Sequence, residues 1–270
     1  MDPSAWRRVM KIGDVGLDVR AWRLFLWSER YHLSGADDSF EYSTHNATVA
    51  WQKAHGLAGD GVVGDLTRAK IDQAPTVRAP ASFNPEAVRF IEAANWSRDV
   101  PAQKKTVIVL HSMEYPESST SAEWCAQFFA GKQGPAPRAS AHFCIDDDSV
   151  VCCVPADRIA WHAPGANAFG IGIEHAGYAR QSRAQWLDDY SLRMLSLSAQ
   201  LTAWLCARFS IPVQFVVADH LARGGRGITT HAEVTKAFGK STHTDPGPFF
   251  PVGDYLRFVV EAQQRSGQRA

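Results

Sequence analysis

Three residues from separated parts of the chain have side chains that bind transition metals, namely His111, His231 and Asp245. Imidazole nitrogen and carboxylate oxygen are ordinary zinc ligands, and a catalytic zinc site uses three protein ligands and leaves a further position open. Because only a folded chain could bring these segments together, the set suggests a zinc hydrolase. The alternative is that His231, His243 and Asp245 are polar loop residues without a metal, since spacing alone is weak evidence.

The segments around these residues are suited to hold them in fixed positions. The apolar run at residues 106–110 has the length and composition of a buried strand and ends directly at His111. Asp245 precedes a Pro-Gly-Pro sequence at 246–248, in which the prolines restrict φ and the glycine can adopt the angle that a turn requires. A strand end and a stiff turn would therefore present two of the three side chains.

The composition is that of a globular protein. The chain has 270 residues, of which 45% are hydrophobic and 21% charged, and its formal net charge is +0. Such a chain is poorly suited to bind nucleic acid by neutralising phosphates, so we expect no nucleic-acid partner. The length predicts one large domain or two unequal domains.

Neither a secretory signal peptide nor a membrane span is predicted. The first residues lack the apolar core of a signal peptide, and no apolar run approaches the roughly 20 residues that span a bilayer. We therefore expect synthesis in the cytosol without membrane insertion, and we expect a monomer. The five cysteines have no metal-type spacing, which favours reduced and buried thiols.

Residues 12–71 have a compact pattern that predicts three short helices. Asp14 or Asp18 can cap a first helix, apolar residues then recur at helical spacing, and glycines at 61 and 64 mark a turn before a last helix. Residues 72–83 contain two prolines and several small residues, which is typical of a linker. We therefore predict a three-helix domain at 1–73, a linker at 74–84 and a second domain at 85–270.

The first domain resembles the peptidoglycan-binding type 1 domain. That family has a central F-Q or W-Q and a closing G-L-x-x-D-G-x-x-G-x-x-T, which are matched by Trp51-Gln52 and by residues 56–67. Ala21-Trp22 stands where Leu-Gln is usual. The resemblance implies that this domain binds cell-wall peptidoglycan, and the alternative is a helical cap without a ligand.

From residue 85 onward, helical and strand patterns alternate. Helices are predicted at 86–96, 119–130, 185–209 and 252–264, and strands at 106–110, 140–145, 150–154, 169–173 and 214–218. Three aspartates at 146–148 suit a hairpin turn better than a calcium loop, because the later glutamate of such a loop is missing. The fold class is therefore α/β or α+β, with a mixed central sheet flanked by helices after the small three-helix domain.

The second domain resembles the type 2 N-acetylmuramoyl-L-alanine amidases, a group that includes phage amidases and peptidoglycan recognition proteins. In this family the zinc ligands are a histidine ending the first central strand, the histidine of I-T-x-H and the aspartate of T-D-P-G-P. Residues 107–111, 228–231 and 244–248 match these motifs in that order. The resemblance implies that His111, His231 and Asp245 bind Zn²⁺.

Two further segments match stretches that line the groove near the metal in this family. S-x-H-Y/F corresponds to residues 140–143, and A-W-H-A-G corresponds to the A-W-H-A-P-G sequence at 160–165. The resemblance implies substrate contacts for His142, Trp161 and His162. For His162 the other role is a hydrogen bond behind the metal, and His142 is alternatively a structural histidine.

Two residues are implied in catalysis. The G-I-G-I-E sequence at 170–174 matches the catalytic strand of the family's bacterial branch, which makes Glu174 the general base, unless it is simply a charge at a strand end. Many relatives have a lysine two residues before the aspartate ligand, where this chain has His243. An imidazole can still donate a hydrogen bond to an oxyanion, with a sharper dependence on pH. The alternatives are that Lys240 takes this role, or that His243 replaces Asp245 as ligand.

These patterns predict a zinc-dependent peptidoglycan hydrolase that cleaves the amide between N-acetylmuramic acid and the L-alanine of the stem peptide. A wall-binding domain without a signal peptide favours a phage endolysin, made in the host cytoplasm and released to the periplasmic or cell-wall peptidoglycan. The alternatives are a cytosolic amidase that recycles muropeptides and a recognition protein that binds peptidoglycan without cutting it.

Overall fold

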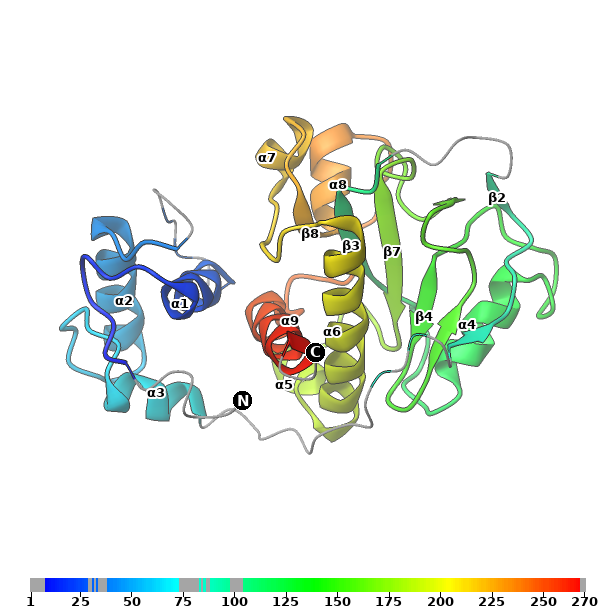
Figure 1. Cartoon of the computed structure of the whole chain (residues 1–270). Coiled ribbons are helices and arrows are strands. Elements are labelled where there is room, and N and C mark those ends of the chain that lie inside the picture. The colour runs from blue at the N-terminus through cyan, green and yellow to red at the C-terminus, as the bar shows by residue number, and fades with distance from the viewer. Residues whose placement is uncertain are drawn as a thin grey trace. The chain divides into compact units, whose positions relative to one another are not determined.

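The structure is a computed structural model of the whole chain (Figure 1). It describes residues 8–28, 31, 33, 38–72, 83, 85, 88–97 and 104–267. Apart from Phe83, the predicted linker at 74–84 lies outside the described residues. The chain divides into two compact units, residues 1–76 with 251–268 and residues 77–250 with 269–270.

The N-terminal part of the first unit contains helices α1 (Leu17–Ser28), α2 (Tyr42–Ala54) and α3 (Asp65–Asp72). Aromatic rings fill its core, where Trp22 stacks on Phe25 and meets the edge of Trp51 at a centroid distance of 5.6 Å. Trp22 and Trp51 are 0% and 2% exposed. Both tryptophans therefore stabilise the core and do not form a sugar-facing surface.

The side chain of Gln52 connects the W-Q and D-G motifs by hydrogen bonds. Its amide nitrogen donates to Asp60 Oδ1 at 2.8 Å, to Thr67 Oγ1 at 3.0 Å and to the Val62 carbonyl at 2.9 Å, while its oxygen accepts from the Gly61 N–H at 2.9 Å. Because buried polar groups require partners, these residue types are needed together. The motif therefore fixes the turn between α2 and α3.

Helix α9 (Val252–Gly267) also belongs to the first unit, where it packs against α1. Tyr255 and Leu256 on its apolar face are both 0% exposed. The sequence placed this helix in the second domain, whereas the compact units separate at residue 251. The functional domain limits at 73 and 85 stay a prediction.

The second unit is built on a mixed sheet of six strands (Figure 1). The strand order is β1-β5-β4-β7-β3-β8, and neighbouring strands are parallel except β4 and β5. Their bounds are β1 (Arg89–Phe90), β3 (Val107–Ser112), β4 (Phe143–Ile145), β5 (Val150–Cys152), β7 (Gly170–His175) and β8 (Gly227–Thr230). A separate antiparallel pair joins β2 (Trp96–Ser97) and β6 (Ile159–Ala160).

Helices pack against this sheet, which confirms the predicted fold class. Helix α4 (Ser121–Phe129) contacts β4 and β5, α6 (Asp189–Phe209) contacts β4, and α8 (His231–Phe238) contacts β3 and β8. The short helices α5 (Arg183–Trp186) and α7 (Ala218–Ala222) precede α6 and α8 along the chain. The strand predicted at 214–218 is wrong, because among the residues that the structure describes this segment makes only one isolated bridge, between Phe215 and Ile228, and α7 begins at Ala218. Within the described residues, no helix combines the length and the apolar character that crossing a membrane requires.

The helix predicted at 86–96 is wrong. The described part of this segment is extended, since β1 pairs with β5 and the N–H groups of Ile91 and Ala93 donate to the carbonyls of Cys152 and Cys153. The edge of the sheet offers backbone hydrogen bonds to this segment, and they override its amphipathic pattern.

The predicted hairpin between residues 140 and 154 is confirmed by the antiparallel pairing of β4 with β5. Asp146 in its turn is fully buried and accepts hydrogen bonds from the N–H groups of Asp148 and Ser149. Its other oxygen accepts from the N–H of Ala122 at 3.0 Å, in the first turn of α4. This carboxylate therefore shapes the turn and caps a distant helix.

Two buried histidines link backbone segments of the sheet. His142 accepts a hydrogen bond from the Gly172 N–H at Nδ1, and its Nε2 lies 3.1 Å from the Arg158 carbonyl. Nδ1 of His175 lies 2.9 Å from the carbonyl of His111. Burial is the main cause that lowers the pKa of His142 to about 3 and the pKa of His175 to about 4.

The free energy of unfolding should fall as the pH drops below about 6.5, the ordinary pKa of histidine. The folded-state pKa values of His142 and His175 are lowered to about 3 and about 4. As the pH falls, both rings therefore bind protons in the unfolded chain before they do so in the folded chain. The contribution of these two rings to the free energy of unfolding is thus fully present above about pH 6.5. It is lost toward lower pH, with a slope of about 1.4 kcal/mol per pH unit for each ring. Denaturant unfolding at stepped pH measures this slope. In the folded chain, NMR titration of either ring near its ordinary pKa would contradict the assignment.

Candidate active site

Three neighbouring parallel strands end at the site. His111 is the next-to-last residue of β3 and lies opposite Glu174 of β7 in the sheet register. His231 follows β8 directly and is the first residue of α8. Because the carboxyl ends of parallel strands meet at one edge of a sheet, the topology gathers these three side chains from distant parts of the sequence.

Asp245 reaches the same edge from the turn at residues 244–248. A Cβ atom on Gly247, whose φ is 93°, would lie 1.8 Å from the carbonyl oxygen of Ala179, so only glycine fits there. The carbonyl of Asp245 accepts a hydrogen bond from the N–H of Ala232 at 3.1 Å. The turn therefore packs closely against the loop at Ala179 and is hydrogen-bonded to the first turn of α8.

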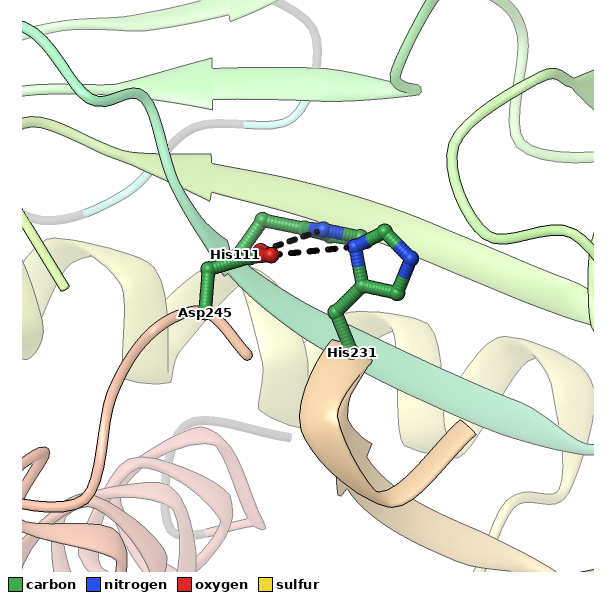
Figure 2. A group of neighbouring side chains, drawn as sticks. All are labelled: His111, His231 and Asp245. Atoms are coloured by element: carbon green, nitrogen blue, oxygen red, sulfur yellow. Dashed lines mark hydrogen bonds and ion pairs between the residues drawn. The ribbon is translucent and has the colours of Figure 1, made fainter. Parts of the chain in front are cut away.

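Figure 2 shows the carboxylate of Asp245 directed toward the two imidazole rings. Its Oδ2 lies 2.9 Å from Nδ1 of His111, and its Oδ1 lies 3.1 Å from Nδ1 of His231. The residues are 8%, 2% and 3% exposed, in the order Asp245, His111 and His231. One ligand atom from each lies within 4.8 Å of the others, a donor set that suits a transition-metal ion. The structure thus gathers the predicted ligands, and their role in binding metal stays a prediction.

The protonation states of His111, His231 and Asp245, called the triad below, also suit a metal. Burial by itself would raise the pKa of Asp245, but hydrogen bonds from His111 and His231 outweigh burial and hold the pKa of this carboxyl well below its usual range. Burial lowers the pKa of His111. An ionised carboxylate and a neutral imidazole are the forms that bind metal ions.

Glu174 lies beside the triad and borders the pocket described below. Burial is the main cause that raises the pKa of its carboxyl well above the usual range, and the negative charges of Asp245 and Glu114 add to the shift. A carboxylate with a raised pKa is a stronger base, and a cation held by the triad would counteract part of this rise. Its position and environment therefore suit proton transfer next to the triad.

His243 stacks on His231 and faces the pocket. The two rings are nearly parallel, at 7°, with centroids 4.6 Å apart. Nδ1 of His243 lies 3.6 Å from Asp245 Oδ1, and its side chain is 65% exposed. His243 is not part of the group whose ligand atoms lie within 4.8 Å of one another, and its role stays a prediction.

A pocket of about 500 Å³ opens beside the triad, bordered by Glu174, His243 and two of the predicted substrate-binding residues, Trp161 and His162. The third, His142, is 0% exposed and bonded at both ring nitrogens, which fits its structural alternative. The predicted substrate contacts stay untested.

The sequence does not single out several residues of the pocket wall. Tyr115 and Trp124 stack at a centroid distance of 3.8 Å, and both border the pocket together with Arg138 and Glu114. Glu114 also has an uncommon φ of 52°. In the sequence Glu114 and Tyr115 are near His111 and Arg138 is near the S-x-H motif, which is too weak a signal to assign a role, and Trp124 has no such signal.

Comparisons with known proteins agree with this architecture. Residues 101–248 match the family Amidase_2, described as N-acetylmuramoyl-L-alanine amidase. N-acetylmuramoyl-L-alanine amidase A of Achromobacter lyticus is 26% identical over 180 residues, which cover 62% of this chain and 90% of that protein. The 1,6-anhydro-N-acetylmuramyl-L-alanine amidase AmpD of Salmonella typhimurium is 27% identical over 175 residues, which cover 58% of this chain and 80% of that protein.

A solved structure, that of the Staphylococcus aureus hydrolase AmiA in complex with its ligand, has a similar fold. Its TM-score is 0.51 at 14% sequence identity, and the similarity covers 77% of this chain and 94% of that one. The family match includes the three strand ends, the turn and all residues of the triad. The chain therefore belongs to the Amidase_2 family of N-acetylmuramoyl-L-alanine amidases, enzymes that cleave the amide between a muramoyl group and L-alanine.

Proposed function

We propose that this peptidoglycan amidase depends on zinc and that His111, His231 and Asp245 hold the metal. The observation that carries the proposal is the buried set of one nitrogen from each histidine and one carboxylate oxygen within 4.8 Å of one another. Nδ1 of each ring faces the carboxylate of Asp245. Zinc bound to these atoms would supply Lewis acidity toward the scissile carbonyl.

Residues around the triad carry out the proton transfer and stabilise the charge that develops in the reaction. Glu174 takes a proton from the attacking water and returns it to the amine of L-alanine as the amide breaks. His243 donates a hydrogen bond to the carbonyl oxygen as negative charge develops there. Trp161 contacts the substrate from the pocket wall. Glu174 and His243 suit these roles because both border the same pocket as the triad.

Metal analysis tests the ligand set. The purified parent chain should hold one zinc ion, and His111→Ala should lose it because one of three ligands is removed. The control is His220→Ala, which changes an exposed histidine and should keep the metal. A full equivalent of zinc in a folded His111→Ala chain would contradict the ligand assignment, whereas loss of activity alone does not test it.

Substitution of Glu174 by glutamine tests the general base. The amide side chain keeps the size but cannot accept the proton, so activity should fall by roughly 10²–10⁴-fold while zinc content stays the same. The control is Glu92→Gln, which alters an exposed carboxylate and should leave activity unchanged. Cleavage by Glu174→Gln within a few-fold of the parent would show that another group is the base.

Substitution of His243 tests the oxyanion donor. His243→Ala removes the hydrogen bond and should lower kcat by roughly 10²–10³-fold with little change in KM, because the interaction forms mainly in the transition state. His243→Lys restores a donor of the kind that many relatives have and should retain much of the activity. Equal loss in both variants, or a change confined to KM, would remove this role from His243.

We further propose that the N-terminal part of the chain binds cell-wall peptidoglycan and that the enzyme acts as a phage endolysin. The support is the W-Q and D-G pattern, whose residues form the network around Gln52. A module that holds the enzyme on insoluble walls raises the local concentration of substrate, which is worth up to about 10²–10⁴ in apparent affinity.

The second candidate is an amidase that recycles soluble muropeptides. The similarity to AmpD of Salmonella typhimurium, which is described as a 1,6-anhydro-N-acetylmuramyl-L-alanine amidase, favours it. Such an enzyme meets its substrate in solution and gains nothing from a wall-binding module.

Sedimentation with purified cell walls separates the two candidates. The Glu174→Gln chain should sediment with walls although it does not cut them, and the same chain without residues 1–79 should stay in solution. With Glu174 restored, the shortened chain should cleave soluble muropeptides at nearly the parental rate but intact walls more slowly, and the soluble substrate checks that it still folds. Equal cleavage of walls by both lengths, together with no sedimentation, would favour the recycling amidase.

A further inference from the structure

His162 lies behind His111, on the side away from Asp245. Its Nδ1 is 3.1 Å from Nε2 of His111, and the two rings are perpendicular, at 88°. The other nitrogen of His111 lies 2.9 Å from Asp245 Oδ2. The two ring nitrogens of His111 therefore face two different partners, the triad on one side and His162 on the other.

This arrangement determines where the protons of the two imidazoles lie when the triad holds a cation. A neutral imidazole has one N–H donor and one nitrogen lone pair. A cation at Nδ1 of His111 uses the lone pair there, so the proton of His111 is on Nε2 and points at His162. Nδ1 of His162 must then accept this hydrogen bond, and the proton of His162 is on its Nε2.

The ring of His162 is held in this position by its surroundings. The backbone N–H groups of His162 and Ala163 both donate to Oδ1 of Asn167, at 3.0 and 2.6 Å. On the other side, a Cβ atom on Gly172 would lie 2.5 Å from Cγ of His162, and one on Gly170 would lie 3.1 Å from its Cε1. The two glycines of the G-I-G-I-E strand thus leave the space that this ring occupies.

The second histidine of the triad has a different and longer contact behind it. Nε2 of His231 lies 3.4 Å from the hydroxyl oxygen of Ser241. The 3.1 Å contact of His111 with His162 is shorter, and its acceptor is a buried ring that is 7% exposed. The hydrogen bond behind a metal-binding histidine fixes its tautomer and ring orientation and raises its basicity.

We propose that His162 is a positioning residue that accepts a hydrogen bond from Nε2 of His111 and so directs Nδ1 of His111 toward the metal. This assignment rests on the proposed zinc site. It gives His162 a role apart from substrate contact, and it gives the two glycines of β7 the function of admitting its ring.

Zinc affinity of the full-length chain, measured by competition with a chromophoric chelator, tests the assignment. Asparagine and glutamine are a matched pair at position 162, because both are amides but they place their polar atoms differently. His162→Asn carries an oxygen where Nδ1 was and should bind zinc nearly as tightly as the parent. His162→Gln places its amide near the former Nε2 and should bind zinc roughly 10–100-fold more weakly.

A second measurement does not depend on affinity. In the zinc-loaded parent, ¹⁵N NMR should detect a protected Nε2–H on His111, and His162→Asn should keep this signal while His162→Gln loses it. Circular dichroism of the metal-free chains confirms that each variant is folded, and His162→Leu, which has no acceptor, serves if the glutamine variant does not fold.

The possible outcomes separate this assignment from the zinc proposal. Equal zinc affinity of the parent, Asn and Gln chains overturns the role of His162 and leaves the ligand set intact. Equal weakening in the Asn and Gln chains also overturns it, because the ring would then matter for packing and not as an acceptor. A parent chain that binds no zinc overturns the ligand set and, with it, the positioning role.

Discussion

The carboxylate of Asp245 is the interaction on which the site depends, since each of its oxygens lies against a different histidine. A buried carboxylate is costly unless it is paired and hydrogen-bonded. Its cost is offset here only when the ends of β3 and β8 and the turn at 244–248 are all in place. The parallel pairing of β3 with β8, the glycine at 247 and the bond from Ala232 can therefore be understood as conditions for this one contact.

The elements that carry short, local signals could be predicted from the sequence, and so could the candidate ligands. The strand that carries His111 and the stiff turn after Asp245 follow from composition alone, and the order of three motifs indicated the candidate ligand set. The segment at 86–96 was not predictable in this way, because its amphipathic spacing is compatible with a helix. Only the presence of β5, more than fifty residues later, makes the extended form better.

The roles of the individual histidines could not be derived from their positions in the sequence. His142, His162 and His175 all stand in or next to strands, yet one bonds a glycine N–H, one faces the ring of His111 and one faces a backbone carbonyl. These roles depend on which ring nitrogen meets which partner, and that is a property of the assembled sheet. The same holds for Gly172, since its sequence context shows no ring that would need the space of its missing Cβ.

A buried lysine helps to keep the histidines near the site neutral. Lys105 is 2% exposed and donates to the Gly170 carbonyl, and burial lowers the pKa of its ammonium to about 8. This cation adds to the causes that lower the pKa values of His142 and His162, after burial itself. Rings kept neutral in this way retain a free lone pair and so can accept hydrogen bonds. The buried ammonium of Lys105 thus helps to keep these rings in the neutral form in which they accept hydrogen bonds, while the carboxyl groups of Asp245 and Glu174 border the pocket.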